Sequence, residues 1–506
     1  MQTLDTKRKD IVNFFLKKGM LVSNDLLECV ENEETLSEIY KLVENKPSEN
    51  ITVISKKIKD LLIHKQPSVE RTLSHEESSE SKKTEPEGNV KIVFSYNKAP
   101  KKREANDFIH YFNNRYDAIE KILKQRQELQ NTTSISRIIN KKDREQVSVI
   151  GMVGDKQYTK NNNCILAIED KTGSIKVLVN KNRPDLFKLT KDIMLDEVIG
   201  VVGVNGDKII FSSNLLYPDI PLVKEIKKAE EEAYALFLSD IHVGSKNFLE
   251  EDFGRFLKWI NCELGNESQK QIASKVKYIF ILGDLVDGCG VYPGQEKELV
   301  IKDIKEQYKA CADFLSKIPT KIKLIICPGN HDAMRLAEPQ LPIYKDFSEP
   351  LYNLPNAIMT SNPAMINIHS SDSFPGFDVL VYHGYSFDFY VAEAESIRNR
   401  GGYDRADLLM KFLLQKRHLA PSYTSTLYVP DTKLDFLVID KVPDFFASGH
   451  IHKAAAANYR NVTLISGSCW QSKTAFQEKV GHNPEPSRVP IVNLQTRQIK
   501  MLRFGK

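Results

Sequence analysis

The sequence predicts an α/β fold over residues 230–506, preceded by a small β-barrel and an N-terminal helical unit. Three observations lead to this prediction. Apolar strands alternate with helical stretches in the C-terminal half, and five of these strands end at a polar motif. Five short strands separated by turns lie between residues 146 and 222. The chain has 506 residues, which is too long for a single ordinary domain.

Composition is typical of a globular protein, with 41% apolar and 27% charged residues. No apolar run approaches the roughly 18–20 residues needed to cross a bilayer, so we expect no membrane association. The first thirty residues carry charges such as Lys7, Arg8 and Asp10, unlike a secretory signal. We therefore expect a cytoplasmic protein. The formal net charge of +4 means that any nucleic-acid binding must come from local patches.

Residues 1–64 are predicted to form an N-terminal helical domain, because their apolar residues recur at helical spacing. Those residues include Ile11, Phe14, Phe15, Leu36, Ile39, Tyr40, Ile54, Ile58 and Leu61. Residues 65–90 change character, with six Glu and five Ser between positions 66 and 89. Such a segment cannot bury enough apolar surface to offset its chain entropy, so it is predicted to be a disordered linker.

Residues 91–145 are predicted to be a connecting segment that contains an amphipathic helix. One face of this helix carries Phe108, Phe112, Tyr116, Ile119 and Leu123. We expect this stripe to pack on the next domain, since apolar stripes at helical spacing are more often core than ligand sites.

Residues 146–222 are predicted to form an OB-fold barrel of five short strands. Turn residues occur at Asn161–Asn163, Asp170–Gly173 and Asn205–Asp207, and a helix-like stretch at Leu186–Leu195 precedes the fourth strand. Barrels of this type often bind single strands of nucleic acid. Because the strands show few exposed aromatic residues, a scaffold role is an equally strong alternative.

Five polar motifs follow the apolar strands of the C-terminal domain. They are Ser239-Asp240-Ile241-His242, Gly283-Asp284-Leu285-Val286-Asp287, Pro328-Gly329-Asn330-His331-Asp332, Tyr382-His383-Gly384 and Gly449-His450-Ile451-His452. Residues two apart on an extended segment point to the same side, so D-x-H and H-x-H can each direct two ligands to one site. Imidazole and carboxylate donors suit Mn, Fe, Zn or Ni. One carboxylate such as Asp284 can bridge two ions about 3.5–4 Å apart.

The order of these motifs resembles that of the calcineurin-like metallophosphoesterases, which have a four-layer α/β sandwich fold. The resemblance implies two metal sites that share one carboxylate. One ion is expected on Asp240, His242, Asp284 and His452, and the other on Asp284, Asn330, His383 and His450. His331 is expected to be the catalytic imidazole at the leaving oxygen. Asp332 is expected to orient His331 without binding metal.

Four further strings narrow the resemblance to the small subunits of archaeal D-family DNA polymerases. They are Val291–Gln295, Asn330–Gln340, Arg417–Pro421 and Asp435–Asp440. The resemblance covers residues 95–506, whereas residues 1–90 match only in general layout. Tyr385 departs from the family pattern, because many relatives are expected to carry a basic residue after His-Gly. This difference affects an expected substrate contact and not the metal ligands.

This family resemblance implies a 3′–5′ exonuclease that proofreads for a separate large catalytic subunit of the DNA polymerase. The expected substrates are single-stranded or mismatched DNA 3′ ends, and the expected location is the nucleoid region of the cytoplasm. Mn²⁺ is the expected metal, with Mg²⁺, Fe²⁺ and Zn²⁺ as alternatives. Our hypothesis is that a hydroxide between the two ions attacks the phosphate in line while His331 assists departure of the 3′ oxygen.

Three other functions compete with this interpretation. Stand-alone repair nucleases place the motifs near the N-terminus and a capping domain after them, whereas here the first motif begins at Asp240 and 54 residues follow His452. A general phosphatase would leave the N-terminal barrel without a purpose. A non-catalytic scaffold for the polymerase large chain is opposed by the intact ligands, which the related eukaryotic B-subunits have lost.

Two smaller signals have a structural and a functional interpretation. Trp470, Tyr385 and Phe387 could stack on a base, although packing in the core or at its rim is the favoured interpretation. The segment 498–504 faintly resembles a sliding-clamp peptide. It lacks the second aromatic residue, so a closing β-strand is favoured over clamp binding.

Overall fold

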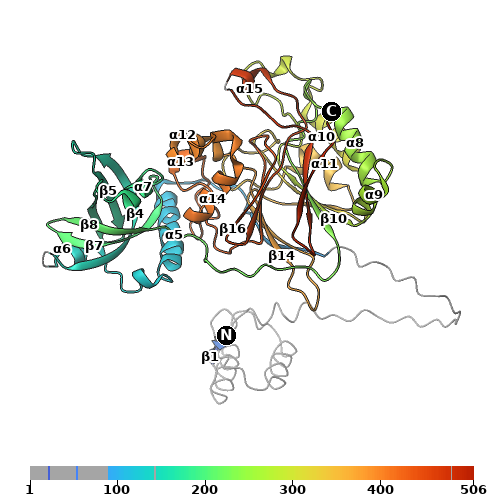
Figure 1. The fold of residues 1–506 in the computed structure, drawn as a ribbon. Coiled ribbons are helices and arrows are strands. Elements are labelled where there is room, and N and C mark those ends of the chain that lie inside the picture. Colours follow the sequence, from blue (N-terminus) through green and yellow to red (C-terminus); the bar gives the residue numbers. More distant parts are fainter. Residues whose placement is uncertain (1–20, 23–52, 55–88, 142–143, 480, 506) are drawn as a thin grey trace, which may run out of the picture. The chain divides into compact units, whose positions relative to one another are not determined.

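The computed structural model describes residues 89–141, 144–479 and 481–505, and two short strands, β1 (Leu21–Val22) and β2 (Val53–Ile54). The chain divides into two compact units, residues 1–84 and 85–506. Strands β1 and β2 pair in parallel within the first unit, so Ile54 lies in a strand and not in the helix that its spacing predicted. The rest of the predicted helical domain and most of the predicted linker lie outside the described residues (Figure 1).

The predicted five-stranded barrel is present and closed, with strand order β4-β5-β6-β8-β7. Its strands are β4 (Gln146–Tyr158), β5 (Cys164–Asp170), β6 (Gly173–Val179), β7 (Val198–Gly206) and β8 (Ile209–Leu216). Helix α7 (Pro184–Thr190) occupies the stretch predicted to be helical and begins with proline, which fits the first turn of a helix. Helix α6 (Ile135–Ile139) packs against β6 through Ile135 and Ile138, which are buried in the barrel core.

The amphipathic helix is α5 (Ala105–Leu123), and the short helix η1 (Gln127–Leu129) follows it. Its C-terminal half packs on the barrel, where Tyr116, Ile119 and Leu123 join one hydrophobic cluster with β4 and β7. Tyr111, one turn earlier, belongs instead to the core of the C-terminal domain. Helix α5 therefore packs on the barrel, as its apolar stripe predicted. It also contacts the C-terminal domain, which was not predicted.

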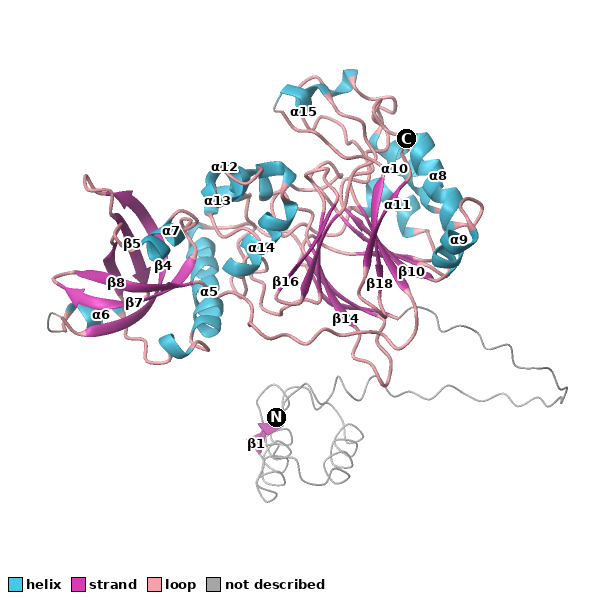
Figure 2. Cartoon of the chain, viewed as in Figure 1, coloured by secondary structure: helices cyan, strands magenta, loops and turns pink. Residues whose placement is uncertain are grey.

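Two six-stranded sheets form the C-terminal domain (Figures 1 and 2). The first has the order β12-β11-β10-β9-β18-β19 and comprises β9 (Tyr234–Leu238), β10 (Val276–Leu282), β11 (Lys323–Cys327), β12 (Ala357–Met359), β18 (Arg488–Asn493) and β19 (Ile499–Arg503). The second has the order β16-β17-β15-β14-β13-β3 and comprises β3 (Val90–Ser95), β13 (Ala364–Ile368), β14 (Phe377–Val381), β15 (Phe445–Ser448), β16 (Ala455–Tyr459) and β17 (Val462–Ser466).

The sheets stack face to face, with Phe237, Phe280 and Phe445 in the core between them. Helices cover both outer faces, so the predicted four-layer sandwich is confirmed. The first sheet is covered by α8 (Glu250–Ile260), α9 (Glu267–Ser274), α10 (Ile304–Leu315) and α11 (Lys345–Tyr352). The second is covered by α12 (Phe387–Glu393), α13 (Glu395–Arg398), the short helix η3 (Gly402–Asp404) and α14 (Ala406–Lys416). The remaining short helices are η2 (Gln295–Lys297), η4 (Tyr423–Ser425) and α15 (Ala475–Lys479).

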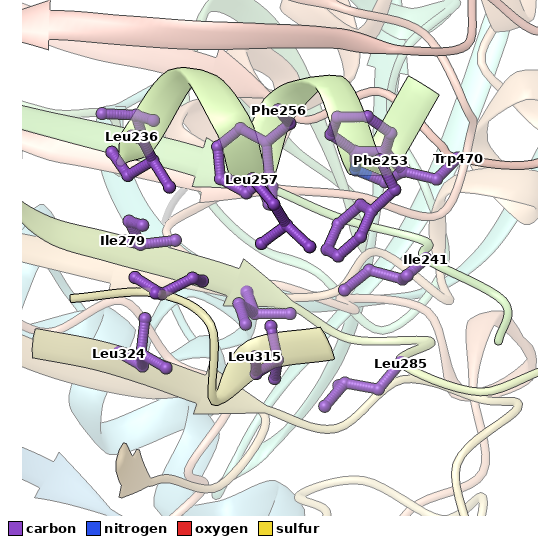
Figure 3. Packing of buried hydrophobic residues seen from close by; sticks show 14 of the residues in the cluster. Leu236, Ile241, Phe253, Phe256, Leu257, Ile279, Leu285, Leu315, Leu324 and Trp470 are labelled. Carbon is purple, nitrogen blue, oxygen red and sulfur yellow. The ribbon is translucent and has the colours of Figure 1, made fainter. Parts of the chain in front are cut away.

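Figure 3 shows the cluster beneath α8, where Phe253, Phe256 and Leu257 pack over apolar side chains of the first sheet. Each fully buried side chain of this size stabilises the fold by about 1.5–3 kcal/mol relative to exposure. Trp470 lies in the same cluster, with its ring centroid 4.8 Å from that of Phe253. Phe387 is fully buried on the other side of the sandwich. Both residues therefore pack in the core, as the favoured interpretation predicted.

Strand β3 was expected within a connecting segment, but it is the edge strand of the second sheet. It pairs antiparallel with β13, with Phe94 opposite Met365. The sandwich therefore takes one strand from before the barrel and the others from after it. In chain order, α5 and the whole barrel lie between β3 and β9.

The segment that resembles a clamp peptide forms β19, which pairs antiparallel with β18. Phe504, its aromatic residue, is 8% exposed, and its ring centroid lies 5.5 Å from that of Phe256. The prediction of a closing β-strand is confirmed. Among the described residues, no helix combines the length and the apolar character needed to span a membrane.

Candidate metal centre

All five polar motifs lie where the strands that precede them end. They directly follow β9, β10, β11, β14 and β15, whose carboxyl ends lie at one edge of the sandwich. The local sequence explains the placement, because each strand is predominantly apolar and its motif follows directly at its carboxyl end. The seven predicted ligands and His331 consequently lie close together, as the interatomic distances below show.

Several predicted ligands have a left-handed backbone conformation, which is uncommon for residues other than glycine. They are Asp240, His242, Asp284, His450 and His452, with φ between 50° and 72°. Each such residue costs on the order of 1–3 kcal/mol, and such strain concentrates at functional sites. Gly283, with φ 90°, shows how tight these turns are, because a Cβ there would lie 2.7 Å from the backbone nitrogen of Gly329.

One half of the site is formed by Asp240, His242 and His452. The Nε2 atom of His452 lies 3.3 Å from Asp240 Oδ1 and 3.2 Å from Nε2 of His242. The Oδ2 atom of Asp240 accepts the backbone N–H of His450 at 2.9 Å, but Oδ1 is buried and accepts no hydrogen bond. A buried carboxylate oxygen without a donor is costly, and a bound cation would satisfy it.

The other half is formed by Asn330, His383 and His450. The side-chain oxygen of Asn330 lies 2.9 Å from Nε2 of His383 and 3.0 Å from Nδ1 of His450. Asp284 lies between the halves, because its Oδ2 atom is 3.3 Å from Nε2 of His383 and 3.9 Å from Nε2 of His242. Its Oδ1 atom accepts the backbone N–H of His331 at 2.8 Å. The geometry thus brings together the two predicted groups with Asp284 shared.

Every histidine of the two groups has one ring nitrogen occupied by a partner outside the cluster. The contacts are His242 Nδ1 to Asp287 Oδ1 (3.2 Å), His383 Nδ1 to the Leu282 carbonyl (2.7 Å), His452 Nδ1 to the Gln477 amide (2.9 Å) and His450 Nε2 to Asp388 Oδ2 (3.1 Å). Such partners fix the orientation of metal-binding imidazoles and leave the second nitrogen for the ion. The remaining nitrogens all face the cluster.

The electrostatics of the cluster favour positive charge. Burial lowers the pKa of His383, but the neighbouring Asp284 outweighs this effect and raises it to about 10. His242 behaves likewise, since burial is outweighed by Asp287 and Asp284, which raise its pKa to about 9. In the absence of cations, protons are drawn to these imidazoles, and metal binding would displace them. The oxygen and nitrogen donors therefore fit two divalent ions.

His331 lies beside the first group, with its ring centroid 4.8 Å from that of His242. Its Nδ1 atom is 2.7 Å from the carbonyl oxygen of Asp287, so Nδ1–H donates there and Nε2 remains available. Burial lowers the pKa of His331 below its ordinary value.

The contacts of Asp332 differ from the role predicted for it. Its carboxylate accepts the backbone N–H of Gly329 at 2.9 Å and the hydroxyl of Tyr308 at 3.0 Å, whereas the imidazole of His331 is held by Asp287. Burial raises the pKa of Asp332 to about 7. Asp332 thus fixes the loop that carries Asn330 and His331, and it does not orient the imidazole directly.

Asp287 was part of the second motif but was not predicted to have a role. Its carboxylate accepts hydrogen bonds from the amides of Gln471 (2.9 Å) and Gln295 (3.0 Å) while it contacts His242. The only feature of the sequence that indicated a role for Asp287 was its position three residues after Asp284 in the same motif. Asp388 and Gln477 carried no signal at all, because they lie 62 and 25 residues, respectively, from the histidines that they contact.

Asp388→Ala is expected to weaken metal binding by about tenfold, within the 10- to 100-fold range typical of a partner that orients a metal-bound histidine. The reason is that His450 would lose the contact that fixes its ring. Isothermal titration with Mn²⁺ measures the effect. Asp346→Ala on α11 is the matched control, since it removes an exposed carboxylate outside the site. Equal Mn²⁺ affinity in the two variants would contradict the orienting role.

Comparison with known proteins identifies the family. Residues 234–454 match the calcineurin-like phosphoesterase family. The chain is 40% identical over 402 residues to the DNA polymerase II small subunit of Methanothermobacter thermautotrophicus, a match that covers 79% of this chain and 80% of the relative. The proteins of the same name from Archaeoglobus fulgidus and Pyrococcus abyssi are 38% and 39% identical, over 79% and 78% of this chain and 78% and 62% of their own lengths.

Among solved structures, an archaeal phosphodiesterase covers 53% of this chain and 98% of its own at 12% identity and a TM-score of 0.26, which is too distant to add to the assignment. The predicted family rests on the sequence relatives and is confirmed by them. The chain belongs to the family of archaeal DNA polymerase II small subunits and contains a calcineurin-like phosphoesterase domain.

Proposed function

We propose that this chain is a 3′–5′ exonuclease that removes nucleotides from DNA 3′ ends by two-metal phosphodiester hydrolysis. The observation that carries the proposal is the full set of seven predicted ligands, gathered in two groups that share Asp284, with a buried oxygen of Asp240 that accepts no hydrogen bond. A subunit that served only as a scaffold would have no use for this arrangement, which costs backbone strain at five positions.

Each half of the site would hold one divalent ion, for which we propose Mn²⁺. Asp240, His242 and His452 would hold the first, and the second group with Asn330 would hold the other. Two bound ions polarise a phosphate and lower the pKa of an attacking water. Asp284 contributes by keeping a negative charge between the two groups, and Asp287 by holding His242 in place.

His331 is placed to move a proton. Because its Nδ1–H is held by the carbonyl of Asp287, only Nε2 can exchange a proton with a substrate. We assign this atom to the 3′ oxygen of the penultimate nucleotide, which must gain a proton as the terminal nucleotide leaves. General acid catalysis of this type contributes about 10²- to 10⁴-fold.

The family assignment supports a large catalytic polymerase subunit as the partner and DNA 3′ ends as the substrate. Proofreading for that subunit is therefore the biological role that we propose. A sliding clamp is not part of the proposal, since β19 is paired and Phe504 is packed against α8.

His331→Ala is expected to slow shortening of a primer by about 10²-fold or more. The assay uses the complex with the large subunit, Mn²⁺ and a 5′-labelled primer with a mismatched 3′ end, for which the wild type should give a ladder of products. His110→Ala on the exposed side of α5 is the matched histidine control. An unchanged ladder with His331→Ala would remove the imidazole from the mechanism. A wild-type complex that leaves the primer intact would favour the scaffold alternative.

A further inference from the structure

We propose that an aromatic groove beside the metal cluster binds the unpaired bases at a DNA 3′ end by stacking. The aromatic groove is defined by Phe108, Phe112, Tyr385, Phe389 and Tyr423. The inference rests on the proposed function, because it specifies where the substrate of that reaction lies and which form of DNA it must have.

Two adjoining cavities make up the groove, with volumes of about 850 and 680 Å³. Phe108, Phe389, Tyr423 and Thr424 line both cavities, so the two are continuous. The larger cavity ends at Asp155, Lys156 and Ile193 of the barrel, and the smaller one ends at Tyr385 and Asp388 of the phosphoesterase domain. Cavities of this size accommodate ligands as large as nucleotides.

The phosphoesterase end of the groove adjoins the metal centre. Asp388 lines the smaller cavity, and its carboxylate is 3.1 Å from Nε2 of His450. The ring of Tyr385 lies 5.9 Å from the ring of the same histidine. A strand whose terminal phosphodiester reaches the metal centre would therefore have its preceding bases at the groove.

The aromatic residues of the groove are open to a ligand and yet fixed in position. Tyr423 is 48% exposed, and its ring lies 6.1 Å from that of Phe108 and 6.0 Å from that of Phe112. Its backbone N–H donates to Asp196 of the barrel at 2.9 Å, and the hydroxyl of the preceding Ser422 donates to the Leu195 carbonyl at 3.1 Å. Fixed rings lose little entropy when a ligand binds.

The charges in the groove favour bases over phosphates. Asp155, Asp196, Asp388 and Glu393 line it together with a single lysine, Lys156, whose ammonium donates to the Ile193 carbonyl at 3.1 Å. A phosphate backbone would be repelled from these carboxylates and would lie on the solvent side. Stacking on aromatic rings tolerates every base, as a proofreading site requires.

This mode of binding selects unpaired DNA. Bases within a duplex already stack on one another and cannot present a face to Tyr423 or Phe389. A mismatched 3′ end frays more readily than a paired one, so more of its bases can enter the groove. Tyr385 fits this picture, because its ring lies at the end of the groove that adjoins His450.

Tyr423→Ala and Phe389→Ala are each expected to weaken binding of single-stranded DNA by about tenfold, the effect of losing one stacked base. The measurement is fluorescence anisotropy of a 5′-labelled thymidine octanucleotide with the full chain in the absence of divalent metal. Tyr423→Phe keeps the ring and should retain wild-type affinity. Phe347→Ala on α11 is the matched control, since Phe347 is 37% exposed and lies outside both cavities. Thermal unfolding verifies that the variants are folded.

Equal DNA affinity in the wild type and in both alanine variants would overturn the inference, even if the chain hydrolyses DNA. Equal losses with Phe347→Ala would overturn it too, because the effect would not be specific to the groove. Unchanged DNA binding together with weaker association of the purified large subunit would assign the groove to a protein partner instead. Because binding is measured without metal, the inference can succeed or fail independently of hydrolysis and hence of the proposed function.

Discussion

Asp284→Asn is expected to abolish hydrolysis, with kcat/KM lowered by about 10³-fold or more, equivalent to about 4 kcal/mol of transition-state stabilisation. The carboxylate of Asp284 lies near a histidine ring of each half of the site, and Asp284 is 2% exposed. Asparagine keeps an oxygen that can accept the backbone N–H of His331 but removes the negative charge between the halves. The variant therefore tests the contribution of the negative charge while the shape and packing of the side chain stay nearly the same.

The measurement has two parts, hydrolysis of a labelled primer and the number of Mn²⁺ ions bound. We expect two ions per wild-type chain and fewer in Asp284→Asn. Asp346→Ala, the exposed control, should match the wild type in both measurements. A variant that binds two ions and cleaves at the wild-type rate would exclude Asp284 as the shared ligand.

Arg115→Ala is expected to destabilise the fold by about 3–5 kcal/mol, the cost of leaving one charge of a buried pair without its partner. Arg115 on α5 is 1% exposed, and its Nε atom is 2.7 Å from Asp435 Oδ2. Its Nη1 atom also donates to the Pro421 carbonyl at 2.6 Å. Asp435 accepts a further contact from His418 at 2.8 Å. The pair thus ties α5 to the loop that follows α14.

Urea unfolding at two pH values tests the physical cause. Burial raises the pKa of Asp435, but His418 and Arg115 outweigh burial and hold it well below its ordinary value. In the wild type this carboxylate stabilises the fold above the unfolded pKa of about 3.9. Without Arg115, only His418 opposes the effect of burial, so the pKa of Asp435 rises and its protonation relieves the cost of a buried charge. The destabilisation should therefore be larger at neutral pH than near pH 4.

Lys124→Ala is the control for this second prediction, because Lys124 pairs with Glu120 on the exposed surface of the same helix. A surface pair four residues apart contributes only about 0.3–0.5 kcal/mol. A loss from Arg115→Ala that is as small as that from Lys124→Ala would show that the buried pair is not a stabilising element.

The strands of the sandwich and the ligands could be predicted because their signals are local. Strand β11 lies at Lys323–Cys327, as its run of apolar residues predicted, and the motif that follows begins one residue later. Local patterning also predicted the five barrel strands and α7. Asp240 and His242 could be assigned to the same metal site because two residues of one short motif lie near each other in any fold.

Contacts made through the tertiary fold could not be predicted. Gln477 reaches His452 and Asp388 reaches His450 only because the fold brings α15 and α12 to the same edge of the sheets. The contacts of Asp332 with Gly329 and Tyr308 could not be predicted for the same reason, since adjacency to His331 in sequence does not show which way a side chain points at a tight turn. Strand β3 is a short, mostly apolar strand that no polar motif follows, so nothing local linked it to a sheet formed by residues far along the chain.

The position of β3 also dictates an order of events during synthesis. β3 leaves the ribosome before the barrel, yet its partner β13 is made only after the barrel and four strands of the first sheet. In the first sheet, β9 pairs with β18, so this sheet cannot be completed until residues 488–493 have been synthesised. The barrel has all of its pairing partners within residues 146–216 and can close much earlier. A nascent chain thus carries a finished barrel while the candidate metal centre, whose last predicted ligands are His450 and His452, is still incomplete.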